Sequence, residues 1–340
     1  MAKHKIAAVV RAEPDFEILE KQLAGLDYEM DITICNSTGE TIEAIKGADV
    51  IITQVVPMPR EVIEEIDTAQ AIVSFGHGFD RIDHNAATEK GVMVVNSAGF
   101  CSEEVSSHAI MLLLACAKDL NRLNNLVKSR GWTPEMRPFE IPLVAIDGQT
   151  VGLVGLGNIG RATARKAKVF GLEVIAYDPY VPPWIAREYK VELVPSLDAL
   201  AGRSDFVSMH VPLNDETRGL AGEALFKAMK PTAFFINTCR GPTQDEQALI
   251  KALQSGSIAG AGIDVFEKEP TSPDNPLLKM DNVIVTPHTA GTSVTSTVVV
   301  HTQLGQETAR ILNGTLPMSL VNPEVRHKIT TRPLAVQHPG

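Results

Sequence analysis

A glycine-rich turn near the middle of the chain constrains the fold more than any other feature of these 340 residues. The turn has the pattern Gly-x-Gly-x-x-Gly, follows the apolar residues 151–154 directly, and opens a segment whose apolar residues repeat with helical spacing. In such a strand–turn–helix unit the first glycine permits the tight turn, the second admits a pyrophosphate close to the main chain, and the third lets the helix pack on the strand. The unit predicts a dinucleotide site, with the phosphates at the helix N-terminus and with cofactor contacts at Gly155, Gly157, Asn158, Ile159 and Gly160.

An acidic residue ends the next apolar segment, residues 173–177. Asp178 lies 18 residues after Gly160, near the spacing of about 20 at which a carboxylate binds the adenosine ribose of a dinucleotide. Its carboxylate would accept hydrogen bonds from the ribose hydroxyls and repel a 2′-phosphate. Because the residues that follow, Pro179 and Tyr180, are not basic, we expect NAD (NADH) rather than NADP as the cofactor.

Short apolar segments alternate with helical patterns along most of the chain, which predicts βαβ units and parallel sheets. One series occupies residues 1–101, and a second begins near residue 150, after a long amphipathic segment at about residues 102–126. We therefore expect an α/β protein of two domains with a cleft between them. A Rossmann NAD-binding domain would span residues 102–292, and a flavodoxin-like substrate domain would combine residues 1–101 with a returning helix and tail, residues 293–340.

The composition restricts the partners and the compartment. A net charge of −10 argues against nucleic acid or an anionic membrane as a partner. The longest apolar run, residues 109–117, is far shorter than the roughly 20 residues that cross a bilayer, and the N-terminus lacks the pattern of a signal peptide. The cysteines have neither CxxC nor zinc-finger spacing, so we expect a cytoplasmic protein without a metal site and with free thiols at Cys35, Cys101, Cys116 and Cys239.

Three residues with acid–base or anion-binding chemistry follow predicted strands of the second series: Arg240, Glu269 and His288. Ligands of open α/β sheets bind at the carboxyl ends of the strands, so we expect these side chains to converge. Taken singly, each residue also has a common structural role, as a cap, a core histidine or a solvated charge. Together they suit the reduction of a 2-keto acid: His288 would supply the proton to oxygen, Glu269 would hold the imidazole, and Arg240 would bind the carboxylate and carbonyl.

The chain resembles the D-isomer-specific 2-hydroxyacid dehydrogenase family over about residues 1–325. The match comprises six segments in order and spacing: residues 155–160, 177–179, 210–213, 237–241, 262–270 and 286–291. The resemblance implies an NAD-dependent oxidoreductase that interconverts a D-2-hydroxy acid and a 2-keto acid, with the family's catalytic residues at Arg240, Glu269 and His288. It also implies further cofactor contacts at His210, Val211, Pro212, Thr238, Cys239, Asp264, His288 and Gly291.

The resemblance extends to the first series of strands and helices. The segment Gly76, His77 and Gly78 matches the family's glycine turn that holds the substrate carboxylate, together with Arg240; successive N–H groups in a tight turn form such an anion site. The family also implies a homodimer through an arm at residues 121–148. One departure is Ser107, where many relatives carry an acidic residue.

The substrate stays open at this point. Glyoxylate, hydroxypyruvate and a larger apolar 2-keto acid are all compatible with the sequence, whereas a phosphorylated substrate needs cations, for which only Arg60 and Arg81 are candidates. The family includes phosphoglycerate dehydrogenases, glyoxylate reductases and the C-terminal-binding proteins, and residues 177–180 and 319–325 are similar to the last branch. The alternatives are an NAD(H)-sensing scaffold of that type and a formate or phosphite dehydrogenase on the same fold.

Overall fold

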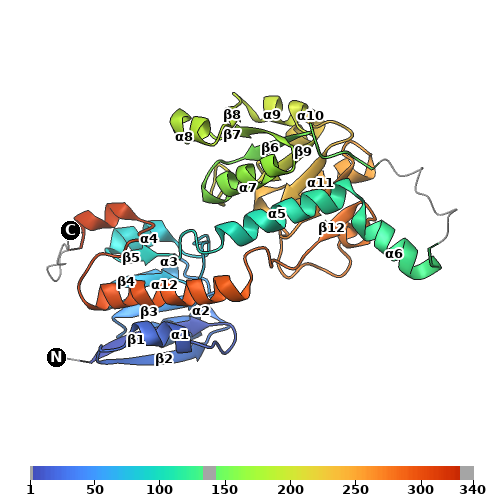
Figure 1. The fold of residues 1–340 in the computed structure, drawn as a ribbon. Helices are drawn as coiled ribbons and strands as arrows, with labels where there is room; N and C mark the ends of the chain where they lie inside the picture. Colours follow the sequence, from blue (N-terminus) through green and yellow to red (C-terminus); the bar gives the residue numbers. More distant parts are fainter. Residues whose placement is uncertain (1–2, 133–142, 330–340) are drawn as a thin grey trace. The chain divides into compact units, whose positions relative to one another are not determined.

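The computed structural model describes residues 3–132 and 143–329. The chain divides into two compact units: the first comprises Met1–Phe100 with Ser293–Gly340, and the second comprises Cys101–Thr292 (Figure 1). Each unit contains one sheet of parallel strands flanked by helices. The predicted α/β class is therefore confirmed.

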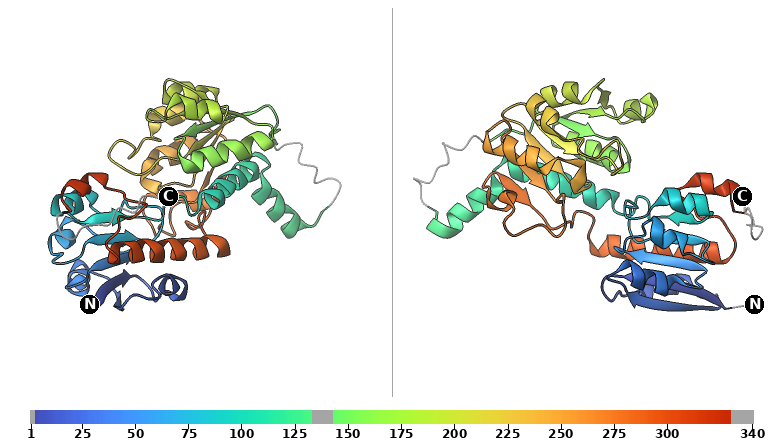
Figure 2. Two further views of the ribbon diagram at one scale, coloured as in Figure 1. Left: turned by 60° about the vertical axis from the view of Figure 1, so that its left-hand side comes forward. Right: turned by 180° about the vertical axis from the view of Figure 1, so that it is seen from behind.

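The first unit is built on a five-stranded sheet in the order β2-β1-β3-β4-β5, which is the flavodoxin-like order. The strands are β1 (His4–Val10), β2 (Tyr28–Ile34), β3 (Val50–Gln54), β4 (Ala71–Ser74) and β5 (Met93–Val95). The sheet is packed against α1 (Glu17–Gln22), α2 (Thr38–Ile45), α3 (Arg60–Glu64), α4 (His84–Lys90) and α12 (Val294–Leu312). Figure 2 shows α12, in red, running beside the blue strands although it is far from them in sequence. The edge strand β2 was missed in the sequence because half-exposed and charged residues interrupt its apolar pattern.

The second unit contains a seven-stranded sheet in the order β12-β11-β10-β9-β6-β7-β8. Its strands are β6 (Thr150–Val154), β7 (Glu173–Tyr177), β8 (Glu192–Leu193), β9 (Phe206–Met209), β10 (Phe234–Asn237), β11 (Gly260–Ile263) and β12 (Val283–Val285). The chain order reverses between β6 and β9. Ligands of doubly wound sheets bind at such a switch point, outside the carboxyl ends of the strands.

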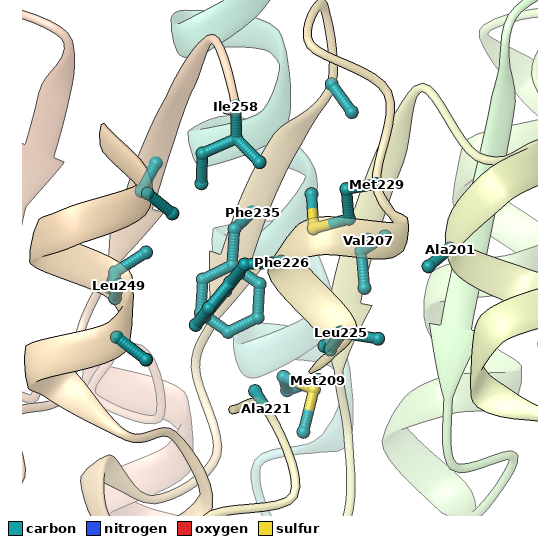
Figure 3. Packing of buried hydrophobic residues seen from close by; sticks show 14 of the residues in the cluster. Ala201, Val207, Met209, Ala221, Leu225, Phe226, Met229, Phe235, Leu249 and Ile258 are labelled. Atoms are coloured by element: carbon teal, nitrogen blue, oxygen red, sulfur yellow. The ribbon is translucent and has the colours of Figure 1, made fainter. Parts of the chain in front are cut away.

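Helices cover both faces of this second sheet. One face packs on α5 (Ser102–Ala117), α7 (Asn158–Val169) and α8 (Pro183–Glu188). The other packs on α9 (Leu197–Arg203), α10 (Glu223–Ala228) and α11 (Glu246–Gln254). Figure 3 shows the core on this second face, where the rings of Phe226 and Phe235 meet edge to face at a centroid distance of 5.2 Å. Two covered faces explain why the strands are apolar without strict alternation.

Two helical segments differ in detail from what their sequence patterns suggest. The segment 102–126 is not one helix, because Asp119 adopts a left-handed conformation (φ 48°) that separates α5 from α6 (Leu120–Arg130). The motif Thr243-x-x-Glu246 resembles a capping box, yet Thr243 lies in a short 3₁₀ turn, and the N-cap of α11 is Asp245. The Asp245 side chain accepts the main-chain N–H of Ala248 at 2.9 Å.

The described part of the chain has neither a membrane-spanning helix nor a metal-binding cluster, and its cysteines form no disulfide. Within residues 3–132 and 143–329, no helix has both the length and the apolar character to cross a membrane. The same residues contain no cluster of three or more side chains that could hold a metal ion. All four cysteines are free thiols; three are buried and Cys239 is half-buried.

Candidate active site

The predicted cofactor and catalytic residues of the second unit lie at one edge of its sheet. Residues Asp178, His210, Thr238 and Asp264 each follow the last residue of a strand. Parallel pairing aligns these strand ends: Val154 pairs with Tyr177 of β7 and with Met209 of β9. The carboxyl ends of β6, β7, β9, β10, β11 and β12 therefore bring together segments that are far apart in the sequence, from Val154 to Val285.

The three glycines of the turn after β6 meet different surroundings. Gly155 has φ 96°, and a Cβ there would lie 2.7 Å from the carbonyl oxygen of His210. A Cβ on Gly160 would lie 2.3 Å from the carbonyl oxygen of Gly155. A Cβ on Gly157 would meet no described atom within 4 Å, and Gly157 is the N-cap of α7. The first and third glycines are therefore required by packing, whereas the second leaves open space in front of the first N–H groups of α7, Asn158 and Ile159 included.

Asp178 is fixed by three main-chain N–H groups. Its Oδ2 accepts the N–H of Leu156 in the glycine turn at 2.8 Å. Its Oδ1 accepts the N–H groups of Tyr180 at 2.9 Å and Val181 at 3.0 Å. A carboxylate has about four acceptor positions, so one remains for a ribose hydroxyl. Asp178 therefore ties the glycine turn to the end of β7 and still presents an acceptor there.

His210 and Thr238 supply buried polar atoms at this edge. Burial lowers the pKa of His210 to about 4, so its imidazole is neutral at neutral pH, and its Nε2 lies 2.9 Å from the Ser208 hydroxyl. The His210 Nδ1 and the Thr238 hydroxyl are buried and have no hydrogen-bond partner within the described residues. Buried polar atoms are normally paired, so these atoms fit a site completed by a bound cofactor. Of the residues after His210, Val211 packs on the turn at Gly155, and Pro212 accepts the Thr217 hydroxyl at 2.6 Å.

A buried asparagine shapes the turn that carries Arg240. The side-chain amide of Asn237 donates to the carbonyl oxygen of Arg240 at 3.3 Å, and its oxygen accepts the N–H of Cys239 at 3.0 Å. The Arg240 guanidinium donates to the carbonyl oxygen of Cys239 at 2.7 Å. Burial raises the pKa of the Cys239 thiol, which disfavours the thiolate. Sequence analysis did not single out Asn237, although it opens one of the matched segments.

The turn after Arg240 packs against the loop that carries Glu269. A Cβ on Gly241 would lie only 1.7 Å from the carbonyl oxygen of Phe266, so the two main chains are in direct contact. The N–H of Phe266 donates to Glu269 Oε1 at 3.1 Å. The charge of Arg240 also contributes to lowering the pKa of Glu269. The structure therefore places Arg240 and Glu269 in adjoining segments.

Glu269 and His288 form a direct pair, with Glu269 Oε2 2.7 Å from His288 Nδ1. Burial by itself would raise the pKa of Glu269. The hydrogen bond and charge of His288, the N–H of Phe266 and the charge of Arg240 together outweigh burial, and the pKa lies below its usual value. Glu269 is therefore a carboxylate at neutral pH. It contacts His288 through Nδ1, so the other ring nitrogen, Nε2, takes no part in this pair.

The main chain at His288 is held in an uncommon conformation. Its φ is 55°, a left-handed region that costs a non-glycine residue about 1–3 kcal/mol. The N–H of His288 donates to the Asp264 carbonyl at 2.8 Å. The buried Asp264 carboxylate accepts the N–H groups of Thr289 at 2.9 Å and Ala290 at 2.8 Å. Asp264, predicted as a cofactor contact, thus also fixes the His288 turn.

His108 extends this network and was missed in the sequence. The Thr286 hydroxyl donates to Asp264 Oδ1 at 2.5 Å. His108 Nε2 lies 2.9 Å from the same hydroxyl, so the hydroxyl accepts a hydrogen bond from His108. In the same unit, Gly291 lies against Cys101, whose sulfur would be 3.4 Å from an added Cβ. No local pattern could reveal the pairing of His108 with Thr286, because 178 residues separate them.

The predicted substrate turn lies in the first unit, at the end of β4. Gly76 has φ 119°, and its carbonyl oxygen accepts the N–H of Ser97 at 2.9 Å. The carbonyl oxygen of His77 accepts the Asn96 amide at 2.6 Å. The carbonyl oxygen of Gly78 accepts the Ser74 hydroxyl at 3.0 Å. The carbonyl oxygens of the turn are therefore directed into the protein.

Comparison with known proteins identifies the family. The family model described as "D-isomer specific 2-hydroxyacid dehydrogenase, NAD binding domain" matches residues 110–290. The chain is 36% identical to a glyoxylate reductase of Korarchaeum cryptofilum over 91% of this chain and 95% of that protein. It is 37% identical to a D-3-phosphoglycerate dehydrogenase of Methanocaldococcus jannaschii, over 86% of this chain and 55% of that protein.

A solved structure agrees with these matches. The NADPH-dependent glyoxylate/hydroxypyruvate reductase of Sinorhizobium meliloti, in complex with NADP and malonate, superimposes with a TM-score of 0.83 and is 28% identical, covering 95% of this chain and 98% of that one. The present chain belongs to the D-isomer specific 2-hydroxyacid dehydrogenase family, and it is an oxidoreductase with an NAD-binding domain. The predictions of the family, the enzyme class and the cofactor are confirmed.

Proposed function

We propose that this family member interconverts a small D-2-hydroxy acid and its 2-keto acid, with His288 as the acid–base group and NAD(H) as the cofactor. The observation that carries the proposal is the 2.7 Å contact between His288 and Glu269. The loop that carries Glu269 packs against the turn that carries Arg240. A histidine oriented by a carboxylate is suited to general acid–base catalysis. Arginine offers a planar set of donors that matches a carboxylate.

The cofactor would lie along the carboxyl edge of the second sheet. The turn Gly155–Gly160 and the start of α7 would bind the pyrophosphate, and Asp178 would bind the adenosine ribose. The remaining contacts would come from His210, Val211, Pro212, Thr238, Cys239, Asp264, His288 and Gly291. When bound, NADH supplies the hydride. The carboxylate of Asp178 favours NAD over NADP, because a 2′-phosphate would meet a like charge.

Reduction of the keto acid then requires one proton on the carbonyl oxygen. Arg240 binds the substrate carboxylate and polarises the carbonyl. As the carbonyl carbon gains the hydride, its oxygen gains the electron pair of the C=O π bond and takes the proton from His288 Nε2. Glu269 stabilises the imidazolium before the transfer. In the reverse direction, neutral His288 accepts the hydroxyl proton.

The first unit would supply the second anchor for the substrate carboxylate. We assign this role to the turn Gly76, His77 and Gly78, because its carbonyl oxygens already accept hydrogen bonds from Ser97, Asn96 and Ser74. With the carbonyl oxygens directed inward, the N–H groups of a tight turn point the other way, which suits an anion. The first unit would thus be the substrate domain and the second the cofactor domain.

The basic residues near this turn favour a substrate without phosphate. Arg60 forms a bidentate pair with Glu89 at 2.7 and 3.1 Å and lies 3.7 Å from Asp83. Arg81 donates to the carbonyl oxygen of Val55 at 3.4 Å. Both cations are thus already engaged with protein oxygens, whereas a phosphate would need them. We propose glyoxylate or hydroxypyruvate, rather than phosphohydroxypyruvate, as the substrate class.

A spectrophotometric assay tests this function. Purified protein is mixed with NADH and each of glyoxylate, hydroxypyruvate, phosphohydroxypyruvate, pyruvate and phenylpyruvate, and NADH absorbance is followed. His288→Ala should lower kcat roughly 10²–10⁴-fold while NADH binding, measured by fluorescence, persists. His327→Ala, in the 3₁₀ turn Pro323–His327, is the matched control. NADH binding without turnover of any keto acid would contradict the proposal and favour an NAD(H)-sensing scaffold.

We also propose a homodimer in which α6 contributes to the interface. Along α6, whose residues the structure describes in full, none is buried, and Leu120 and Val127 are 60% and 43% exposed. Such an apolar helix surface is typical of an interface. The predicted arm at residues 121–148 includes residues 133–142, which lie outside the described chain. Light scattering of Leu120→Glu/Val127→Glu should give a monomer mass; an unchanged dimer mass would exclude α6.

A further inference from the structure

Two loops at the carboxyl edge of the second sheet meet through their side chains. Tyr180 lies in the loop after β7, and Glu216 lies in the loop after β9. The Tyr180 hydroxyl donates a hydrogen bond to the Glu216 carboxylate. In the sheet, β6 lies between β7 and β9. The contact therefore spans the end of β6, where the glycine turn begins.

Both ends of this contact are positioned by their own loops. The N–H of Tyr180 donates to Asp178 at 2.9 Å. The main chain of Tyr180 is therefore held by the residue that we assign to the ribose. On the other side, the Asn214 side chain accepts the N–H of Glu216 at 3.1 Å and that of Thr217 at 3.0 Å. These hydrogen bonds limit the freedom of both main chains, which lowers the entropic cost of joining the side chains.

The loops after β7 and after β9 each carry an acidic side chain close to this contact. The hydrogen bond to Glu216, its charge, and the charge of Asp178 are among the causes that raise the pKa of Tyr180. The phenol is therefore neutral and acts as the donor in its hydrogen bond to Glu216. Asp178 and Glu216 thus place two carboxylates on opposite sides of the end of β6. The basic residue Arg161, in the first turn of α7, donates a hydrogen bond to Asn158 Oδ1 at 2.5 Å and lies over the Tyr189 ring.

We propose that Tyr180 and Glu216 form a strap across the adenosine half of the cofactor site, and that Glu216 is a second carboxylate that discriminates against a 2′-phosphate. The inference rests on the proposed function in one respect, since it requires the dinucleotide to lie along the glycine turn. A 2′-phosphate on a ribose bound by Asp178 would face like charge from both loops, and such repulsion is strongest at low ionic strength. Neither side chain takes part in the proton transfer.

The test compares dissociation constants for NADH and NADPH by fluorescence at low ionic strength. Glu216→Gln should tighten NADPH binding about tenfold, which corresponds to 1.4 kcal/mol, and change NADH binding by less than about threefold. Tyr180→Phe breaks the strap but keeps the carboxylate. It should weaken NADH binding about threefold and leave the preference for NADH in place.

Asp215→Asn is the matched control, because it removes the same charge from the neighbouring exposed position. An equal gain in NADPH affinity in Glu216→Gln and Asp215→Asn would overturn the inference, since it would show a general charge effect. An unchanged NADPH affinity in Glu216→Gln would also overturn it.

A further variant separates this inference from the proposed function. If wild-type protein binds NADH and Asp178→Asn loses this binding, the dinucleotide site stands, and Glu216→Gln alone decides the role of the strap. If wild-type protein binds neither NADH nor NADPH, both proposals fail. ADP-ribose and its 2′-phosphorylated form, used as competitors, should reproduce the NADH and NADPH results, because the strap faces the adenosine half only.

Discussion

Two glycine turns end buried parallel strands in this protein, and they are built on different principles. In the turn after β6, added Cβ atoms on Gly155 and Gly160 would lie 2.7 and 2.3 Å from main-chain oxygens. In the turn after β4, a Cβ on Gly76 would meet no described atom within 4 Å, yet φ is 119°. The first turn needs glycine for space, and at Gly155 also for a φ of 96°, whereas the second needs it for its dihedral angle alone. Sequence alone shows glycine in both and does not separate the two requirements.

The helices that follow the two turns also begin differently. α7 starts at Asn158, directly within the first turn, and its N-cap is Gly157, which has no side chain to satisfy the first N–H groups. α4 starts later, and the carboxylate of Asp83 caps it by accepting the N–H of Ala86 at 2.8 Å. Only the first turn therefore offers a helix N-terminus to a phosphate. The second is limited to the N–H groups of the turn, which suits one carboxylate.

Gly160→Ala should give the largest effect. The added Cβ would meet the Gly155 carbonyl, which is main chain and cannot rotate away, so we expect a loss of roughly 3 kcal/mol in the free energy of unfolding and no measurable NADH binding. Urea unfolding and NADH fluorescence measure the two effects. Gly202→Ala is the control, since its Cβ would lie at an ordinary 3.7 Å from the nearest carbonyl. Equal stability of the two variants would show that the β6 turn is not space-limited.

Gly157→Ala should separate binding from stability within the same turn. Its φ of −71° suits alanine, and its Cβ would enter open space, so the free energy of unfolding should stay within about 1 kcal/mol of wild type. The same methyl group would occupy the approach of the pyrophosphate. We expect the NADH dissociation constant to rise at least about tenfold. An unchanged constant would mean that the pyrophosphate does not lie at this turn.

His210, which packs against the first turn, also predicts that the stability of the protein depends on pH. Burial lowers the pKa of His210 from 6.5 to about 4, so between these values the unfolded chain binds a proton that the folded chain does not. Stability from this group is complete above pH 6.5 and is lost as the pH falls towards 4. Between pH 7 and pH 5 wild type should lose about 2 kcal/mol more than His210→Gln. If wild type and His210→Gln show the same shift in urea midpoint between pH 7 and pH 5, His210 is not held neutral by burial.

Much of the site was predictable because it depends on the ends of strands. Alternating apolar and helical segments indicated parallel sheets, and in parallel sheets the residues that follow the strands share an edge. This reasoning places Asp178, Arg240, Glu269 and His288 at one edge from the sequence alone. The direct contact of Glu269 with His288 at 2.7 Å agrees with that expectation of convergence. The roles of these residues stay predictions until the variants are measured.

The supporting contacts were not predictable, because they depend on close approach between distant segments. His108 reaches Thr286 across 178 residues, and the contact of Gly241 with Phe266 needs both loops in place. The left-handed conformations of Asp119 and His288 carry no glycine to signal them. Thus the local patterns indicated which residues gather at the edge, and tertiary packing decides how each is held.

Gly76→Ala tests the second turn and decides the comparison. With open space around it, the new methyl group causes no clash; the cost is that of a positive φ in alanine, about 1–2 kcal/mol. NADH affinity should be unchanged, whereas KM for the keto acid should rise, because relaxing φ turns the N–H groups away from the carboxylate. Gly39→Ala is the control in the same unit: its surroundings are equally open, but it lies in α2 without a positive φ, so it should be neutral or stabilising. If the two variants unfold at the same urea concentration, the dihedral angle is not what requires glycine at position 76, and the distinction between the two turns fails.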